Sequence, residues 1–525
     1  MTGLGCTREM QSSHDAAKID IAFDDPNLIA DAGLVPVVAL AERVGLPGLV
    51  ADRVKITDAA NSGGANAAAK VMSLLAGMVA GADSIADTDR LRLAAMEVAF
   101  GGVRAPSTLG TFLRSFTHGH VRQLHSVHRQ VLVELAAATP LLPGAEVLAF
   151  VDVDSTHRQV FGYSKQGAAV GRLKGIKTLH PLLATISTPI ARPVIAGIRL
   201  RKGKSADVRG AAPLLAEALA TARDAGCTGA VVVRADSKFY TADFVATAAR
   251  AGAYVSITTG SNPSVNAAIA AIDADAWTPI HYPDAFTDPD TGELISDAEV
   301  AEIAYVAFAG KPKRLRAPGR LIVRRVKRLN PQASGQGELF DVWRHHAVFT
   351  TSPYQMLQAE TQHRGHAVVE QVIADAKASA LAHLPSASFA ANAAWATAWA
   401  IAHNLTRATG ALASGFHARA TTPTIRAHLI NIPARLARSA RRITLHLPER
   451  WPLADPLREP PRRPPPATTR RRLTDHPPEP GPTSTATVEK PDRPAARPRP
   501  KPATTQRRST KSDQMINDSR SVDPG

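Results

Sequence analysis

Residues 147–154 read VLAFVDVD, an apolar run that ends in two aspartates separated by one valine. Its β-branched and apolar content predicts a strand over Val147–Val153 that ends at Asp154. Residues 230–237, AVVVRADS, repeat this pattern, with a short all-apolar strand leading to Asp236. Acids at the ends of adjacent buried strands can converge without being buried themselves. The two stretches therefore predict a carboxylate pair at one edge of a sheet.

Around these two stretches, strand patterns alternate with helical ones. We expect further strands at His180–Ser187, Pro193–Leu200 and Tyr254–Thr258, and helices at Ala206–Ala225 and Phe244–Ala251. The predicted order is three strands, a helix, a strand, a helix and a strand. This order indicates an α/β fold with one mixed sheet.

The composition points to a polyanionic partner. The formal net charge is +16 over 525 residues, and the pI is about 10.1. Such an excess favours nucleic acid, although a basic tail can raise a pI without specific binding. The two cysteines, Cys6 and Cys227, lie far apart in sequence, which excludes a disulfide framework or a cysteine-based zinc site. Met1–Asp20 has no apolar signal core and no apolar run is long enough to span a membrane, so we expect a cytoplasmic protein.

A third acid, Glu370, lies in a helix predicted over Ala367–Leu384. At about 100° per residue, His363, His366, Glu370 and Lys377 fall on one face of this helix. Three carboxylates can hold two divalent metal ions about 3.5–4 Å apart, where one ion activates the attacking oxygen and the other stabilises the leaving oxygen. Magnesium suits such oxygen ligands. A solvated helix face could show the same pattern.

The three acidic segments resemble the catalytic motifs of DDE transposases from bacterial insertion sequences. The segments are residues 154–156 (DST), residues 234–237 (RADS) and Glu370-x6-Lys377. The most similar group has the last motif Tyr-x2-Arg-x3-Glu-x6-Lys, and the likeness runs from about Leu40 to Trp451. The sequence departs from this motif by having His363 and His366 at the tyrosine and arginine positions. A histidine can still donate to a phosphate, but its charge depends on pH.

The resemblance implies an RNase H-like catalytic domain with a β-rich insertion between the second and third acids. It also implies that Asp154, Asp236 and Glu370 are catalytic and hold two Mg²⁺ ions, with Mn²⁺ as a possible substitute. The implied partner is double-stranded DNA, both the terminal repeats of the element and the target. Synapsis of two ends implies a homodimer, and DNA binding implies a bacterial, nucleoid-associated location.

Six segments follow from these patterns. They are a flexible leader (1–18), a helical N-terminal domain with DNA-end contacts (19–144), the first part of the catalytic core (145–260), the β-rich insertion (261–340), the second part of the core with C-terminal helices (341–447) and a Pro/Arg-rich tail (448–525). The tail should be disordered, because it cannot bury enough apolar surface to offset the entropy of ordering. The N-terminal helices could equally be simple scaffold.

Several basic residues are candidates for contact with DNA. They are Lys377, His363, His366, Arg234, Lys174 and Lys177, together with Arg201 in a possible basic rim. Arg234 could instead pair with a carboxylate. Asp152 alternates with Asp154 along the strand, so it should share its face and could either support the site or serve structure alone.

The sequence thus predicts a DDE-type DNA transposase that cuts DNA at the ends of an element and joins the freed 3′-hydroxyl to target DNA. Two alternatives stay open. One is a nuclease of the same fold that cuts without strand transfer, and the other is a catalytically inactive transposase retained as a DNA-binding repressor.

Overall fold

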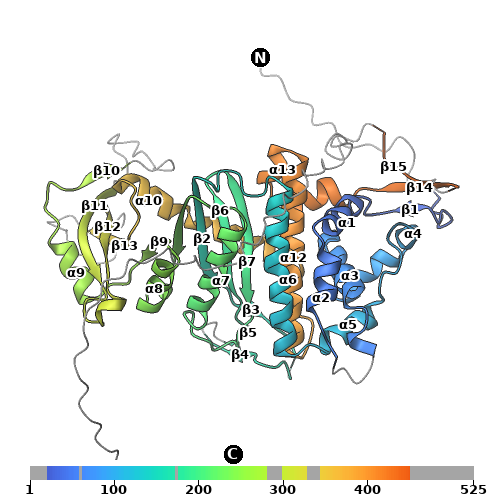
Figure 1. The fold of residues 1–525 in the computed structure, drawn as a ribbon, viewed down its shortest axis with the longest axis horizontal. Coiled ribbons are helices and arrows are strands. Elements are labelled where there is room, and N and C mark those ends of the chain that lie inside the picture. Colours follow the sequence, from blue (N-terminus) through green and yellow to red (C-terminus); the bar gives the residue numbers. More distant parts are fainter. Residues whose placement is uncertain are drawn as a thin grey trace, which may run out of the picture. The chain divides into compact units, whose positions relative to one another are not determined.

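The computed structural model describes residues 20–57, 62–162, 164–171, 175–280, 298–327, 343–440 and 442–449. The predicted leader and nearly all of the predicted tail lie outside these ranges. The fold is mixed α/β, as predicted, and its centre is one large mixed sheet. Figure 1 shows this sheet between helices on both sides, with a mainly helical part formed by the N-terminal third of the chain.

The central sheet has nine strands. In sheet order they are β10 (Thr278–Ile280), β11 (Ala298–Ala307), β12 (Ala317–Lys327), β13 (Trp343–Thr350), β9 (Tyr254–Thr258), β8 (Ala230–Ala235), β2 (Leu148–Ser155), β6 (Leu182–Thr188) and β7 (Ala191–Arg199). β2, β8 and β9 are parallel to one another, and every other neighbouring pair is antiparallel. The predicted order of strands and helices from β2 to β9 is confirmed, with α7 (Ala211–Asp224) and α8 (Ala242–Arg250) as the two helices.

The region predicted as a β-rich insertion is joined to the same sheet. β12 pairs with β13 over Arg320–Lys327, and β13 pairs with β9 through Val348–Thr350. Leu321 and Val323 of β12 and Phe349 of β13 are buried in the main core. The β content was thus predicted, but these strands extend the central sheet instead of forming a separate one. The physical reason is that β9 would otherwise be an open edge, which β13 covers.

Alternate residues of β2 face opposite sides of the sheet. Ala149, Val151 and Val153 belong to the main hydrophobic core. Leu148 and Phe150 form a smaller cluster on the other side with Val232 of β8, and Tyr354 packs against it. Tyr354 precedes α10 (Met356–Arg364) and α11 (Val368–Lys377). Because side chains alternate along a strand, Asp152 and Asp154 share this second side.

Two long helices stand between the sheet and the N-terminal helices (Figure 1). α6 (His118–Ala138) and α12 (Phe389–Ala413) pack on each other and on β7, and α12 also contacts α1, α3 and α5. α6 starts with a capping box between Thr117 and His120. α12 is capped by Ser388, and its alanine-rich sequence favours a helix. The side chain of Trp395 on α12 is fully buried, and its indole N–H donates to the Ala380 carbonyl.

The N-terminal third is mainly helical, as predicted. Its remaining helices are α1 (Leu34–Arg43), α2 (Leu46–Arg53), α3 (Ala67–Ala80), α4 (Met96–Phe100) and α5 (Pro106–Arg114), and the other short helices of the chain are α9 (Pro263–Ala270), α13 (Gly415–Arg419) and α14 (Thr422–Ile425). In the described ranges, no single helix has both the length and the apolar composition to cross a bilayer. The bent pair α1 and α2 meets these criteria only when the two are counted together.

Two small sheets were not predicted. β1 (Leu28–Ile29), β14 (Ala434–Ser439) and β15 (Arg442–His446) form one, which joins the two ends of the described chain. β3 (Arg158–Gln159), β5 (Lys177–Leu179) and β4 (Ala169–Val170) form the other, between β2 and β6 in sequence. The first adds two strands, β14 and β15, to the 341–447 segment, for which C-terminal helices were expected. β1 and β14 lie about 400 residues apart, so no local pattern could reveal their pairing.

The helix predicted over Ala367–Leu384 is shorter in the structure. A 3-10 turn over Gly365–Ala367 separates α10 from α11, and α11 ends at Lys377. The prediction was therefore wrong in treating His363 and Glu370 as members of one continuous helix. Gly365 fits the turn, because a side chain there would collide with the guanidinium of Arg234.

Candidate functional site

Asp154 and Asp236 lie side by side at one edge of the central sheet. β2 and β8 are parallel, and Val153 is opposite Ala235, so the next residue on each strand is an aspartate. The side chain of Asp236 is about half exposed, at 48%, and that of Asp154 is partly buried. The structure thus brings together the two strand carboxylates that the sequence predicted to converge.

The two carboxylates disfavour each other's charge. Burial raises the pKa of Asp154, and the negative charge of Asp236 raises it further, while the Ser155 backbone N–H that donates to Asp154 Oδ1 at 2.6 Å lowers it. The Nζ of Lys238 lies 3.9 Å from Asp236 Oδ2 and compensates part of this charge. Two neighbouring carboxylates also favour a bound cation.

Beneath this pair, Asp152 and Arg234 form a buried ion pair. The Nε and Nη2 of Arg234 donate to the two carboxylate oxygens of Asp152 at 2.7 and 2.8 Å. The side chain of Asp152 is 0% exposed, and that of Arg234 is 3% exposed. The guanidinium also stacks on the Phe150 ring, 3.9 Å from its centroid, and donates to the Gln362 carbonyl at 2.7 Å. This fork geometry fixes β2 against β8 just below the two aspartates.

Two histidines connect the segment around α10 and α11 to the sheet. His366 Nδ1 lies 2.8 Å from Asp152 Oδ1. Burial opposes protonation of His366, but the hydrogen bond and the charge of Asp152 outweigh it and raise the pKa of the imidazole. The ring nitrogens of His363 each lie 3.0 Å from a hydroxyl of β9, that of Ser256 or Thr258. Burial lowers the pKa of His363 to about 3, so this ring is neutral.

The buried network of Asp152, Arg234 and His366 has a regular relation to the three predicted acids. Asp152 precedes Asp154 by two residues on β2, and Arg234 precedes Asp236 by two residues on β8. His366 precedes Glu370 by four residues, about one helical turn. Each member of the network therefore lies on the same segment as one of the acids, and the network ties the three segments together.

Glu370 itself does not touch the aspartates. It is exposed in the first turn of α11, whose buried side carries Val369, Val372 and Ile373. Over the described residues, no three Asp, Glu, His or Cys side chains lie close enough together to form a metal site. The structure thus brings two of the three predicted acids together and leaves the third on a neighbouring segment. Lys377 is exposed in the last turn of α11.

The structure gives several of the residues predicted to contact DNA partners within the protein. Arg234 takes the alternative role of pairing with a carboxylate, and its burial leaves no surface for DNA. His363 and His366 are held by β9 and by Asp152, respectively. Arg201 is also buried, where it donates to the backbone carbonyls of His180 and Asp207. Lys177 is exposed on β5, and Lys174 lies outside the described residues.

Two groups near the aspartates were missed by the sequence reasoning. Lys238 follows Asp236 by two residues, and its position alone could have revealed it. On the other side, Ser155 Oγ donates to Asp207 Oδ1 at 2.9 Å, and His180 Nε2 lies 3.3 Å from the same oxygen. No local pattern signals this second contact, because Asp207 comes from the loop that leads into α7. The contact fixes the end of β2 directly after Asp154.

Comparison with known proteins gives a family. The family model described as "Transposase DDE domain group 1" matches residues 11–463. No curated protein matches the chain. A solved structure of the piggyBac transposase synaptic complex with hairpin DNA is similar at 9% sequence identity and a TM-score of 0.39, over 76% of this chain and 79% of that one.

Proposed function

The chain belongs to the transposase DDE domain group 1 family and is a DNA transposase. On this premise, we propose that it performs cut-and-paste transposition of DNA and that Asp154, Asp236 and Glu370 are its catalytic residues. The proposed reaction hydrolyses a phosphodiester at each end of the element. The freed 3′-hydroxyl then attacks a phosphodiester of the target DNA, and this second step takes place in the same active site. Both steps are in-line displacements at phosphorus, which need a positioned nucleophile and stabilised charge.

The sheet supports an RNase H-like catalytic core as part of this proposal. β7, β6 and β2 are antiparallel neighbours, and β8 and β9 follow β2 in parallel. Two acids stand at the ends of the central parallel strands, and the third stands on a helix that follows. The remaining strands, β10 to β13, enter between the second and third acids in sequence, where the family resemblance places an insertion.

The observation that carries the proposal is the buried network of Asp152, Arg234 and His366. A fully buried ion pair is costly to form and is weak evidence for stability alone. This one joins the three segments that carry the three acids, and it does so directly below the two aspartates. It therefore supports an arrangement in which Glu370 approaches the aspartate pair from the segment anchored by His366.

A pair of divalent cations fits the residues present. Asp154 and Asp236 offer hard oxygen ligands at neighbouring positions, and burial together with the charge of Asp236 raises the pKa of Asp154, which a bound cation would oppose. When bound, Mg²⁺ would lower the pKa of the attacking water and stabilise the leaving oxygen. Asp154, Asp236 and Glu370 would hold the ions, and Mn²⁺ should serve as a substitute because it accepts the same ligands.

Other side chains would position the DNA. Lys238 is exposed beside Asp236 and can neutralise a phosphate oxygen next to the reacting bond. Lys377, exposed at the end of α11, can contact the phosphate backbone. Asp152 and Arg234 would hold the spacing of the two strand carboxylates while charge develops on the phosphate. Pairing of two element ends would take a homodimer.

The test is cleavage of DNA that flanks the reading frame in its own genome, with Mg²⁺ and with Mn²⁺. Asp154→Ala, Asp236→Ala and Glu370→Ala should each lower cleavage by at least about 10³-fold, the scale on which catalytic groups that act as a unit fail. DNA affinity should stay within a few-fold, measured in EDTA. Asp224→Ala, which removes an exposed acid at the end of α7, is the matched control and should cut normally.

Strand transfer needs a separate readout, namely joining of a pre-cut end to a plasmid. Cutting without joining would assign the chain to nucleases and reject the strand-transfer step. Binding without cutting under either metal would identify a repressor. Normal cleavage by Glu370→Ala would remove that residue from the site, even if both aspartates proved essential.

A further inference from the structure

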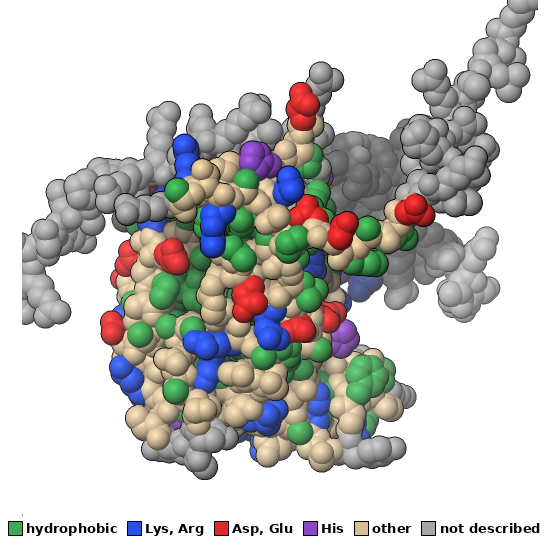
Figure 2. All heavy atoms as spheres, turned by 90° about the vertical axis from the view of Figure 1, so that its right-hand side faces the viewer, with side chains coloured by type: hydrophobic (Ala, Val, Ile, Leu, Met, Phe, Trp, Pro, Cys, Tyr) green, Lys and Arg blue, Asp and Glu red, His purple; other side chains and the backbone are tan. Residues whose placement is uncertain are grey.

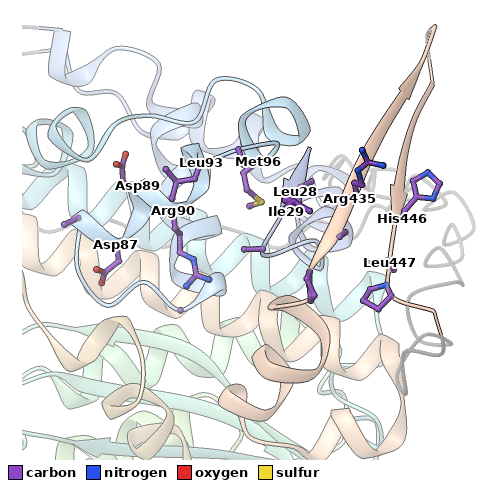
Figure 3. Close-up of a pocket in the computed structure, with 17 residues that line it drawn as sticks. Leu28, Ile29, Asp87, Asp89, Arg90, Leu93, Met96, Arg435, His446 and Leu447 are labelled. Carbon is purple, nitrogen blue, oxygen red and sulfur yellow. The ribbon is translucent and has the colours of Figure 1, made fainter. Parts of the chain in front are cut away.

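β14 and β15 form a two-stranded ribbon that projects from the helical part of the molecule. Figure 3 shows the two strands rising clear of the neighbouring helices, with the turn between them at the far end. From Ala437 to Ser439 and from Arg442 to Thr444, every described residue is exposed. Neither side of this outer half is therefore covered by the rest of the described chain.

The base of the ribbon is firmly held. Leu436 is buried in the main core and Leu445 packs against it. β14 pairs with β1, and the Nε of Arg435 donates to Asp25 Oδ2 at 3.0 Å. A cavity of about 1020 Å³ lies beside the base and includes Arg435 and His446 in its lining (Figure 3). The ribbon is thus an anchored arm with a free tip.

The two faces of the ribbon differ. The register pairs Arg435 with His446, Ala437 with Thr444 and Ser439 with Arg442, so these side chains lie on one polar face. The opposite face carries the apolar anchors Leu436 and Leu445 near the base, and Arg438 and Ile443 toward the tip. The polar face therefore presents hydrogen-bond donors over the whole length of the arm.

The charge of the ribbon has one sign. Residues 434–446 contain four arginines and one histidine, but no aspartate or glutamate. In the described part of the chain, the exposed Arg438 and Arg442 have no acidic partner. Figure 2 looks onto the right-hand end of Figure 1, where β14 and β15 lie, and shows Lys and Arg side chains scattered among acidic and apolar ones over the described surface there. A projecting arm of one charge suits a polyanion.

We propose that this ribbon enters the major groove of double-stranded DNA and reads base edges at the ends of the element. The inference rests on the proposed function, since it supplies the recognition of ends that a transposase needs. A two-stranded ribbon fits a major groove about 12 Å wide, because its strands lie about 5 Å apart. Arginine donates to two acceptors of guanine, and serine and threonine contact either base. The N-terminal helices were one candidate for contact with the DNA ends, and we assign this recognition to the ribbon instead.

The experiment compares binding to two sets of duplexes, with the full chain and in EDTA. One set is drawn from the DNA that flanks the reading frame, and the other has the same composition in scrambled order. Arg442 lies on the polar face and Arg438 on the opposite one, so Arg438→Glu with Arg442→Glu removes one base contact and reverses the charge behind it. It should weaken binding to the flanking duplexes by about 10- to 100-fold, the scale of one lost bidentate base contact. It should also bring their affinity close to that for the scrambled set.

Two further variants separate base reading from charge and from misfolding. Arg438→Lys with Arg442→Lys keeps the charge but loses the planar fork, so affinity for scrambled DNA should persist while discrimination falls about 10-fold. Lys313→Glu with Arg314→Glu makes the same charge change in the exposed turn between β11 and β12. This control should weaken binding to both sets equally. Thermal unfolding should be unchanged in all three, because the altered side chains are exposed.

Retained discrimination in the Arg438→Glu/Arg442→Glu variant would overturn the proposal, and so would a wild-type chain that binds both sets equally. If this variant lost self-association but bound DNA as the wild type does, the proposal would also be overturned. That result would indicate that another chain pairs with the free edge of β15. Failure of the proposed function is distinguishable. A wild type that discriminates the flanking duplexes but never cuts them with Mg²⁺ leaves the ribbon in place and rejects catalysis.

Discussion

Two of the buried polar networks among the described residues are built on opposite principles. Below the aspartates, Asp152, Arg234 and His366 use full charges. Between β7 and α12, Asn404 uses neutral groups: its side-chain oxygen accepts from the Ile195 N–H, and its nitrogen donates to the Ile195 carbonyl, both at 2.8 Å. Its nitrogen also lies 3.3 Å from Nε2 of His128 on α6.

The neutral network solves a problem of structure alone. β7 is at the edge of the central sheet, so Ile195 has an outward N–H and C=O without a strand partner. The amide of Asn404 satisfies both at once, as a neighbouring strand would do. Burial lowers the pKa of His128 on α6 and of His403 on α12 to about 3, so both rings are uncharged. No charge is needed to attach a helix to a sheet edge.

The charged network costs more and sits where the chemistry is proposed. Burial opposes ionisation of Asp152, yet Arg234 and His366 hold its pKa below the usual value. Such networks are rigid only while complete. The difference teaches that full charges are buried here where the spacing of β2 and β8 positions two carboxylates, whereas neutral groups suffice to attach α12 to β7.

The largest effect should come from breaking the charged network. Arg234→Ala leaves the Asp152 carboxylate buried without its main partner, which should lower the free energy of unfolding by about 3–5 kcal/mol in urea denaturation. The double variant Asp152→Leu with Arg234→Met should recover most of this loss, because apolar residues can replace a buried pair. Cleavage should stay low in the recovered protein. Restored cleavage would reduce the network to a stability element.

A smaller effect is expected from the neutral network. Asn404→Ala leaves the two backbone groups of Ile195 unpaired, so the free energy of unfolding should fall by about 1–3 kcal/mol. Metal-dependent cleavage per folded molecule should not change, because β7 carries none of the three acids. Thr397→Ala, a fully buried position on the same helix whose hydroxyl bonds only its own helix, is the control and should cost less. A cleavage defect in Asn404→Ala would link the two networks.

The smallest effect is the change in the free energy of unfolding per pH unit, whose direction differs between the two networks. The pKa of His128 is lowered in the folded state, so only the unfolded state gains a proton as pH falls below 6.5; stability should drop by about 1.4 kcal/mol per pH unit from this residue. The pKa of His366 is raised, so its contribution is complete below 6.5 and is lost as pH rises through the folded value. His128→Leu should flatten the acid side of the stability profile. His366→Gln should instead lower stability mainly below pH 6.5, and the reverse pattern would contradict both assignments.

The sequence predicted the aspartate pair because each member depends on a local pattern. An apolar strand that ends in an acid is visible within eight residues, and the structure pairs the two such strands, β2 and β8, as parallel neighbours. The helix that carries Glu370 was also visible by its periodicity, but its limits were not. The 3-10 turn at Gly365–Ala367 is flanked by contacts of His363 and His366 with the sheet and of Arg234 with the Gln362 carbonyl, which no helical spacing contains.

The sequence by itself determined which residues are acids at strand ends, the order of strands and helices in the core, and the family. Only the tertiary structure decided that Arg234 binds Asp152 and not DNA, that β10 to β12 extend the central sheet, and that a basic ribbon projects beside the N-terminal helices. The physical reason is the range of the interactions. Backbone propensity and apolar spacing act over a few residues, whereas ion pairs and strand pairing join segments separated by up to some 400 residues, and their partners are selected only when the core packs.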